Sequence, residues 1–476
     1  MTRTNWDVIV IGAGAAGENA ADRVVQGGLS AVIVESELVG GECSYWACMP
    51  SKALLRSGLA LRAATNVGGA REAVTGSLDV SAVFARRDKF TSNWNDDGQV
   101  SWLESAGIDL LRGRGRLTGE KSVRVTAADG TDLEITANHA VVVSTGSAAL
   151  LPDVPGLAGA QPWTSRDATS ATSAPESLLI IGGGVVGTEI ATAYASLGTT
   201  VTLVARSGLL GAFEPFAGEH VSAGLEALGV TILSGVSTTR ADRSGGRVVL
   251  KLDDGTEVSA SELLIATGRT PVTDDIGLDS IGLTPGDWIQ VDDTMRAPGF
   301  DWLYAVGDVT HRALLTHQGK YQARAAGDVI AARATGATVH DEPWGAHVAT
   351  ADQAAVPQVT FSDPEVASVG LTAAAAEKAG HRIRVVDYEL GKIAGASLHA
   401  DGYTGRARMV VDESRRVLLG VTFVGPDVAE LLHAATIAVV GEVPIDRLWH
   451  AVPAYPTLSE IWLRLLEEYG RPGSAD

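Results

Sequence analysis

Two cysteines in one short segment are the residues of this sequence with the most distinctive chemistry. Cys43 and Cys48 stand in GGECSYWACMPSK with four residues between them, and the 476-residue chain has no other cysteine. A disulfide scaffold would spread more cysteines along a smaller chain, and a zinc site would need further ligands nearby. The spacing therefore favours a dithiol that cycles between reduced and oxidised forms over a pair of buried, inert thiols.

A glycine-rich loop precedes the cysteines, and a strand and a helix are needed to position it. The apolar run DVIVI at 7–11 predicts a buried parallel strand, and Gly12, Gly14 and Gly17 follow it in G-x-G-x-x-G at the start of a helical stretch. A second apolar run, AVIVE, ends in Glu35. In this arrangement the glycines let the backbone approach a pyrophosphate, and the acidic residue binds ribose hydroxyls. The order of these features predicts a dinucleotide-binding unit.

The same pattern recurs further along the chain. Gly182, Gly184 and Gly187 lie between two apolar runs, and the second run ends at Ala205–Arg206 without a carboxylate. A carboxylate there would repel a 2′-phosphate, whereas Arg206 would attract it. The sequence therefore favours NADPH over NADH, unless Arg206 is only a solvated charge at the end of a strand.

Two nucleotide-binding units beside one dithiol suggest an electron relay. Nicotinamide transfers a hydride, and a flavin can accept it and pass two electrons to sulfur. We therefore expect electrons to move from a pyridine nucleotide to a flavin and then to the cysteines.

Composition limits the partners and the location of the protein. A formal net charge of -20 argues against binding to nucleic acid or to an anionic membrane surface. No apolar run approaches the ~20 residues that a membrane span needs. The N-terminus lacks the pattern of a signal peptide, so we expect a cytoplasmic protein with a small-molecule substrate.

Motifs along nearly the whole chain resemble those of the flavoprotein disulfide reductases, the family of dihydrolipoamide dehydrogenase, glutathione reductase and mercuric reductase. GGECSYWACMPSK is similar to the redox helix of that family, and STGSAALLPDVPG and TGRTPV are similar to its two domain-crossing segments. YAVGDVT resembles its flavin-ribitol contact, and AYPTLSE resembles the last motif of its C-terminal domain. The resemblance implies an FAD-dependent, NAD(P)H-linked enzyme that acts as a homodimer.

The resemblance also implies roles for individual residues. Cys48 would be the charge-transfer thiolate next to the flavin, and Cys43 the interchange thiol that meets the substrate. Lys52 would lie beside the flavin N5 and pair with Glu189, which places positive charge where reduced flavin develops negative charge. Asp308 would bind the ribitol. The cofactor-binding positions that the matching motifs add are Gly41, Thr145, Gly146, Gly268 and Arg269.

The implied fold is a doubly wound α/β protein with two Rossmann-like domains and a C-terminal α+β dimerisation domain. Residues 1–150 and 276–345 would bind FAD, 151–275 would bind NAD(P), and 346–476 would form the dimer interface. Residues 57–105 are expected to be helical with polar interruptions, and 332–355 to be a linker.

The sequence departs from the family in two places. Ser44, Tyr45, Trp46 and Ala47 separate the cysteines, where the family has small or amide residues. The two aromatic side chains could line a pocket, cover the sulfur or fill space. In the C-terminal motif, Tyr455 stands where the disulfide-reducing members have a histidine that shuttles a proton, although Glu460 keeps the position of its glutamate partner.

This second departure leaves several functions open, because a phenol is a poor base near neutral pH and disulfide exchange needs a proton for the departing thiolate. The protein could reduce a disulfide or related sulfur substrate, with Tyr455 as a weak acid. It could instead reduce a quinone, dye or metal ion, as a diaphorase does. A third alternative is cleavage of a thioether, as in 2-ketopropyl coenzyme M carboxylase. A non-catalytic subunit that docks on a multienzyme complex ranks last. His450 could replace the missing histidine, although its spacing is more typical of a surface residue.

Overall fold

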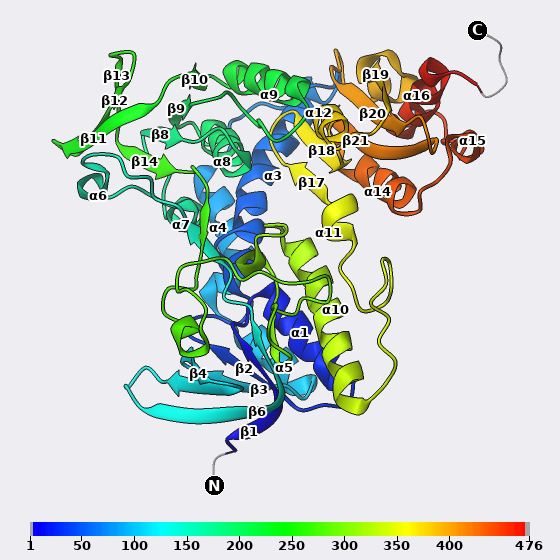
Figure 1. The fold of residues 1–476 in the computed structure, drawn as a ribbon. Helices are drawn as coiled ribbons and strands as arrows, with labels where there is room; N and C mark the ends of the chain where they lie inside the picture. Colours follow the sequence, from blue (N-terminus) through cyan, green and yellow to red (C-terminus); the bar gives the residue numbers. More distant parts are fainter. Residues whose placement is uncertain (1–2, 472–476) are drawn as a thin grey trace. The chain divides into compact units, whose positions relative to one another are not determined.

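The computed structural model describes residues 3–471, which divide into two compact units. Both units are assembled from segments that are far apart in the sequence (Figure 1). Unit 1 comprises Met1–Pro50, Asp88–Leu150 and Arg269–Gln353, and unit 2 comprises Ser51–Arg87, Leu151–Gly268 and Ala354–Asp476.

Unit 1 is built on a seven-stranded sheet of order β3-β2-β1-β6-β5-β4, with β16 paired to β6. Strands β3, β2, β1, β6 and β16 are parallel, whereas β5 and β4 continue from β6 in antiparallel fashion. A separate pair, β7 (Ser147–Ala149) and β15 (Arg269–Pro271), follows the sheet. The strands of the large sheet are β1 (Asn5–Ile11), β2 (Ala31–Glu35), β3 (Asp109–Arg112), β4 (Arg114–Gly119), β5 (Ser122–Thr126), β6 (Asp132–Val143) and β16 (Leu303–Ala305).

Three helices cover one face of this sheet, and a second apolar cluster, formed with β4, β5 and residues of the segment 276–309, covers the other face. The central strands are therefore apolar on both sides. Helices α1 (Ala15–Gln26) and α10 (Thr316–Thr335) lie side by side (Figure 1), and α5 (Asp97–Ser105) packs into the same core. Gly327 of α10 permits this close approach, because a Cβ there would lie 2.5 Å from the Cβ of Arg23. Helix α1 is thus held between the sheet and α10.

The first half of unit 2 contains a parallel sheet of order β10-β9-β8-β14 and an antiparallel sheet of order β11-β12-β13. Strand β8 is buried along its whole length, as expected of a parallel strand with both faces covered. The strands are β8 (Ser177–Ile181), β9 (Thr200–Ala205), β10 (Thr231–Ser234), β11 (Thr238–Ser244), β12 (Arg247–Leu252), β13 (Glu257–Ala260) and β14 (Glu262–Ile265). The helices are α3 (Cys48–Thr65), which begins in unit 1, α4 (Val80–Phe90), which ends in unit 1, α6 (Leu157–Ala160), α7 (Ser165–Ser170), α8 (Val185–Ser196) and α9 (Pro215–Ala227).

The C-terminal part of unit 2 is an antiparallel sheet of order β17-β18-β21-β20-β19 with its own apolar core. The strands are β17 (Pro357–Thr360), β18 (Glu365–Gly370), β19 (Ile383–Glu389), β20 (Arg406–Asp412) and β21 (Val417–Gly425). The helices are α12 (Ala373–Lys378), α13 (Ala394–His399), α14 (Leu432–Val440), α15 (Ile445–Leu448) and α16 (Ile461–Tyr469).

These sheets confirm the expected fold class of two Rossmann-like arrangements and a C-terminal α+β region. The domain boundaries given above stay a prediction. Within 57–105 the structure has helices with interruptions, as expected. In the expected linker at 332–355, α10 continues to Thr335 and the short helix α11 (Ala351–Ala354) closes the segment.

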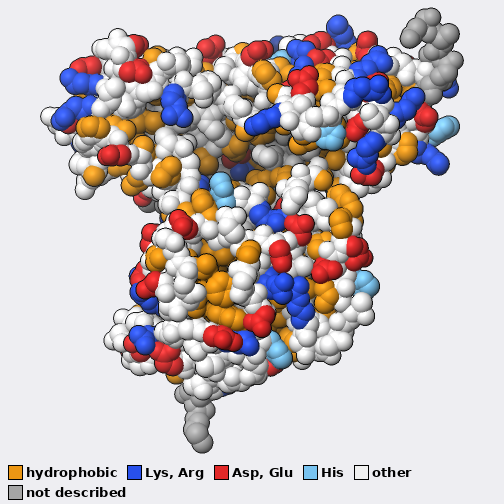
Figure 2. All heavy atoms as spheres, in the orientation of Figure 1, with side chains coloured by type: hydrophobic (Ala, Val, Ile, Leu, Met, Phe, Trp, Pro, Cys, Tyr) orange, Lys and Arg blue, Asp and Glu red, His pale blue; other side chains and the backbone are white. Residues whose placement is uncertain are grey.

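Acidic and basic side chains are interspersed on the surface of each unit on the face that Figure 2 shows. In the part of the chain that is described, no helix is both long and apolar enough to span a membrane.

Candidate active site

The two cysteines lie on two short helices and not on one. Cys43 is in the middle of α2 (Gly41–Tyr45), whereas Cys48 is the first residue of α3. The helix is interrupted because Trp46 has φ −135° and ψ −2°, and the N–H groups of Trp46 and Ala47 both donate to the carbonyl of Glu42. Pro50 is accommodated in the first turn of α3, where its missing N–H costs nothing. The segment that resembles the family's redox helix is therefore divided between α2 and α3.

The two sulfur atoms share a hydrogen-bonded site in unit 1. Both cysteines are in the thiol form; the Cys43 thiol hydrogen-bonds with Cys48, and the Sγ of Cys48 lies 3.2 Å from the Oγ1 of Thr316. The hydrogen bond with Cys48 and burial raise the pKa of Cys43, while Thr316 and the charge of Lys320 act in the opposite direction. Cys43 therefore holds its proton until another group accepts it. Thr316, the first residue of α10, was missed in the sequence because no motif marks it.

Of the two aromatic residues between the cysteines, Tyr45 fills space inside its own unit. It is 1% exposed, and its hydroxyl donates to the carbonyl of Val39 at 3.1 Å. Its ring packs edge-on against Trp46, with 5.6 Å between the ring centroids. Tyr45 therefore packs inside unit 1 and supports α2.

The first glycine loop joins β1 to α1 in a geometry that fits a dinucleotide. Gly12 has φ +102°, and a Cβ there would lie 2.4 Å from the carbonyl oxygen of Ser144. A Cβ on Gly17 would meet the carbonyl of Gly12 at 2.0 Å, whereas one on Gly14 would have no neighbour within 4 Å. The space beside Gly14, at the N-terminus of α1, is where a pyrophosphate would bind.

Other residues predicted to bind the cofactor surround this loop. The Oε2 of Glu35 accepts a hydrogen bond from the N–H of Ala13 at 2.6 Å, so this carboxylate lies at the glycine loop. Gly41 is against the loop as well, because a Cβ there would be 2.8 Å from the Cα of Gly14. Thr145 has a buried Oγ1 without a hydrogen-bond partner among the described residues, and Gly146 follows it with φ +71°. An unsatisfied hydroxyl beside an open glycine loop fits FAD in this cleft.

Asp308 lies in a second polar cluster of unit 1. Its Oδ2 accepts a hydrogen bond from the Oγ of Ser147 at 2.6 Å, and Arg269 is 3.7 Å away. Arg269 also donates to Ser147, because β7 and β15 pair at this point. Gly268, with φ +149°, directly precedes β15. The structure thus brings together Asp308 and Arg269, which were predicted from separate motifs.

The second glycine loop, in unit 2, repeats the geometry of the first. A Cβ on Gly182 would lie 2.2 Å from the carbonyl oxygen of Ala266 and one on Gly187 would lie 2.0 Å from that of Gly182, whereas Gly184 faces open space. The segment after β9 packs on this loop, since the N–H of Leu210 donates to the carbonyl of Gly183 at 2.8 Å. Arg206 is exposed on that same segment. Arg206, the predicted phosphate-binding cation, therefore lies on the segment that packs on the second loop.

Lys52 and Glu189 form the predicted ion pair within unit 2. The Nζ of Lys52 is 2.7 Å from the Oε2 of Glu189, and the carboxylate is 5% exposed. The N–H of Phe361 donates to the other oxygen of Glu189 at 3.0 Å, and Lys52 lies over the Phe361 ring at 5.1 Å. Phe361, which the sequence did not identify, thus fixes both members of the pair. Lys52 is one helical turn after Cys48 in α3.

The predicted C-terminal site residues differ in how far they are exposed to solvent. Tyr455 is 75% exposed. Glu460 is buried and its Oε1 pairs with Arg464 at 2.6 Å, while its Oε2 has no partner among the described residues. His450 is exposed. Within one chain, Tyr455 therefore presents its phenol to the outside.

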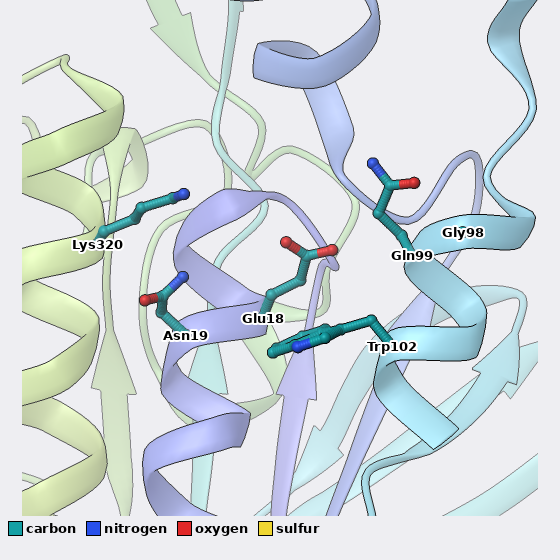
Figure 3. Close-up of a pocket in the computed structure, with 6 residues that line it drawn as sticks. All are labelled: Glu18, Asn19, Gly98, Gln99, Trp102 and Lys320. Atoms are coloured by element: carbon teal, nitrogen blue, oxygen red, sulfur yellow. The ribbon is translucent and has the colours of Figure 1, made fainter. Parts of the chain in front are cut away.

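A pocket of about 300 Å³ in unit 1 was not predicted from the sequence. Glu18 of α1 and Lys320 of α10 point into it, and α5 forms its other wall (Figure 3). Burial raises the pKa of Glu18 to about 7, against the attraction of Lys320 and with a smaller contribution from Glu35. The lining residues are Glu18, Asn19, Gly98, Gln99, Trp102 and Lys320.

Known proteins resemble the whole chain. The pattern of the family described as "Pyridine nucleotide-disulphide oxidoreductase" matches residues 6–336, and that of its dimerisation domain matches residues 356–465. The dihydrolipoyl dehydrogenase of Haloferax volcanii is 32% identical over 98% of this chain and 96% of its own length. The mercuric reductase of Streptomyces lividans is 31% identical over 97% of this chain and 95% of its own length.

Two solved structures share the fold. The Cu(II) complex of RclA, a HOCl-induced flavoprotein disulfide reductase from Escherichia coli, superposes with a TM-score of 0.83 at 22% identity and covers 98% of this chain and 99% of that chain. LpdA from Mycobacterium tuberculosis gives a TM-score of 0.81 at 24% identity and covers 98% of this chain and 100% of that chain.

Proposed function

Because this chain belongs to the pyridine nucleotide-disulphide oxidoreductase family, which uses FAD and NAD(P)H, we propose that it transfers electrons from NADPH through FAD to Cys43 and Cys48 and from them to a disulfide or related sulfur substrate. The observation that carries this proposal is the hydrogen-bonded thiol pair at the start of α3. Two thiols in contact can be oxidised to a disulfide and reduced again with only a short movement of the backbone.

The first glycine loop supports FAD as the resident cofactor. Gly14 leaves room for a pyrophosphate, and Glu35 lies at the loop, where its carboxylate could bind ribose hydroxyls. The hydroxyl of Thr145, which has no hydrogen-bond partner among the described residues, could bind the cofactor as well. When bound, FAD would supply the step that links a hydride donor to sulfur chemistry. Asp308 and Arg269 would hold the ribitol region, and Lys52 would place positive charge near the isoalloxazine, oriented by Glu189.

The second glycine loop supports NADPH as the electron donor. Arg206 is exposed on the segment that packs on this loop, and no carboxylate ends β9. A guanidinium group there would bind the 2′-phosphate that distinguishes NADPH from NADH.

The working form in this proposal is a homodimer. The C-terminal region matches the dimerisation domain of the family, and Ile437, Val440 and Val452 expose apolar side chains there. Covering such side chains is a common reason for association. A cytoplasmic location and the lack of nucleic-acid partners belong to the same proposal, supported by the two-cysteine composition and the acidic net charge.

The proposal is tested by the spectrum of the bound flavin in two cysteine variants. In the wild type, NADPH should produce a long-wavelength thiolate–flavin charge-transfer band. Cys48→Ser should abolish this band, whereas Cys43→Ser should show it even in the oxidised protein, because Cys48 then has no disulfide partner. A Cys48→Ser protein with the wild-type band would disprove the proposal. NADPH consumption is then measured with a panel of disulfides, quinones, mercuric ion and 2-oxoalkyl thioethers. The compounds that support it identify the substrate class.

A further inference from the structure

The relative position of the two sulfur atoms is not set by a continuous helix in this chain. Cys43 lies in α2 and Cys48 begins α3, and the backbone leaves the helical conformation at Trp46 between them. Helix α2 has only five residues, and a helix of this length is not stable on its own. Contacts with other segments of unit 1 must therefore hold Cys43 in place for its hydrogen bond with Cys48.

Tyr45, the last residue of α2, makes two of these contacts. Its hydroxyl donates to the carbonyl of Val39 at 3.1 Å and lies 3.4 Å from the carbonyl oxygen of Asn95. Burial, followed by the charge of Asp96, raises the pKa of Tyr45 to about 12, so the phenol keeps its proton and stays a donor. The ring packs on the turn before α2, since a Cβ on Gly40 would lie 3.1 Å from the Cε2 of Tyr45. Tyr45 thus ties α2 to that turn and to the segment before α5.

Asp96 binds the same turn from the segment before α5. Its Oδ2 accepts a hydrogen bond from the N–H of Val39 at 2.7 Å and another from the Nη2 of Arg112 at 2.6 Å. Arg112 also donates to the carbonyl of Glu37 at 2.7 Å, so the guanidinium group that balances the buried carboxylate contacts this turn as well. Both polar groups of the Val39 backbone are therefore bound, the N–H by Asp96 and the carbonyl by Tyr45.

The chain reaches Asn95 and Asp96 through an unusual backbone conformation. Ser92, Asn93 and Trp94 have φ of +50°, +52° and +54°, and none of them is glycine. Residues with a Cβ rarely adopt this left-handed conformation, and three in succession are rarer still. Such a backbone persists only where the surrounding contacts hold it. The hydrogen bonds that Asn95 and Asp96 accept are contacts of this kind.

The turn before α2 also touches the first glycine loop. The N–H of Gly40 donates to the carbonyl of Ala13 at 2.8 Å, and a Cβ on Gly41 would lie 2.8 Å from the Cα of Gly14. Helix α2 therefore begins from a turn that is bound both by the glycine loop and by the segment 92–96.

We propose that Tyr45 and Asp96 are positioning residues that hold Cys43 against Cys48, and that this anchoring favours the disulfide form of the pair. This inference rests on the proposed function. When the disulfide forms, both S–H bonds break and one S–S bond is made. The dithiol gives two electrons and two protons to the substrate disulfide, which becomes two thiols. A thiol that is already held beside its partner loses little further freedom in this step, so its effective concentration is high.

Tyr45→Phe tests the inference because it removes only the hydroxyl. Flavin-loaded protein is equilibrated without oxygen in mixtures of reduced and oxidised dithiothreitol, and the remaining thiols are counted by maleimide labelling. Oxidised dithiothreitol gains two electrons and two protons from the dithiol and becomes a dithiol itself. The equilibrium constant for forming the protein disulfide should fall roughly fivefold in Tyr45→Phe, as expected for the loss of one hydrogen bond. This change raises the midpoint potential by about 20 mV. An unchanged or larger constant would overturn the inference.

Asp96→Asn should lower the same constant, because it removes the charge that pairs with Arg112. The double variant should show less than the combined effect of the two single variants, since both residues bind the backbone of Val39. Full additivity would contradict a shared anchor.

Tyr194→Phe is the matched control for a general loss of stability. Tyr194 is a buried tyrosine of unit 2 whose hydroxyl donates to the carbonyl of Ala168 at 2.6 Å. Its replacement should lower the Tm, as Tyr45→Phe does, but leave the disulfide equilibrium unchanged. An equal shift of that equilibrium in Tyr194→Phe would show that stability alone accounts for the effect, and would overturn the inference.

These outcomes separate the inference from the proposed function. Wild-type protein that forms no disulfide at any ratio of oxidised to reduced dithiothreitol, and whose flavin shows no charge-transfer band, would refute the proposed function. Wild-type protein that passes both tests, with a Tyr45→Phe equilibrium equal to its own, would refute the anchoring role alone. Should either Tyr45→Phe or Asp96→Asn fail to fold, the other variant decides.

Discussion

Arg206 is the residue on which the choice of nicotinamide nucleotide depends in our proposal. It is exposed on the segment that packs on the second glycine loop. A guanidinium group can form two parallel hydrogen bonds with a phosphate. Reversing its charge should change the preference without changing the fold, because its side chain is on the surface.

The prediction for Arg206 is a switch in cofactor preference. In Arg206→Glu, the ratio of kcat/KM for NADPH to that for NADH should fall by about tenfold or more, equal to about 1.4 kcal/mol of lost discrimination. Steady-state kinetics with both nucleotides measures this ratio. Arg247→Glu, also an exposed arginine of unit 2, is the matched control and should keep the wild-type ratio. Identical ratios in Arg206→Glu and wild type would contradict the assignment.

Tyr455 carries a different prediction, since its phenol replaces the histidine that the family resemblance implies. Native protein should turn over lipoamide and glutathione disulfide poorly, and Tyr455→His should raise this activity roughly tenfold, because imidazole titrates near neutral pH. Tyr455→Phe serves as the control: it removes the hydroxyl but adds no base, and should not raise the rate. High activity of the wild type toward lipoamide would contradict this interpretation of Tyr455.

At the scale of elements, the sequence predicts the two glycine loops and their strands because the strand–loop–helix pattern is local. Gly12 is in the predicted tight turn, where its φ is positive. Gly17 is at the predicted close contact, where the helix packs against that turn. The break between α2 and α3 could not be predicted, since it depends on the backbone at Trp46. Glu18 was missed for a different reason. Its burial requires α5 and α10, which come about 80 and 300 residues later in the chain.

The two loop glycines give an element-scale prediction. Gly14→Ala meets no atom of the chain within 4 Å and should fold normally, yet it should retain FAD at least about tenfold more weakly, because the methyl group occupies the pyrophosphate space. Gly17→Ala should instead lower the Tm, since its Cβ would lie 2.0 Å from a carbonyl oxygen. Flavin absorbance per chain and thermal melts monitored by circular dichroism separate the two effects. The control, Gly159→Ala, also meets no atom within 4 Å and should match the wild type in both measurements.

At the scale of the whole molecule, the exposed apolar side chains of the C-terminal region indicate association between copies. Val452 is 85% exposed and Ile437 is 57% exposed, far more than is usual for large aliphatic residues. The sequence predicted the dimer through its resemblance to a family, but which side chains form the interface could not be read from one chain. Burial at such an interface depends on the fold of both copies.

Ile437→Asp should convert a dimer into a monomer, because an unpaired carboxylate in an apolar interface costs several kcal/mol. Size-exclusion chromatography with light scattering measures the mass of the particle. Leu151→Asp, at an exposed leucine outside the C-terminal region, is the control and should remain dimeric. A monomeric wild type, or an Ile437→Asp protein that stays dimeric, would contradict the predicted interface.

A chain with only two sulfhydryl groups, both at the same site, is its own redox indicator. A maleimide carrying a bulky polymer attaches to the reduced form twice and to the oxidised form not at all, so the two forms separate as distinct bands on a denaturing gel. The oxidation state of this pair can therefore be followed in intact cells, with no background from other positions in the chain.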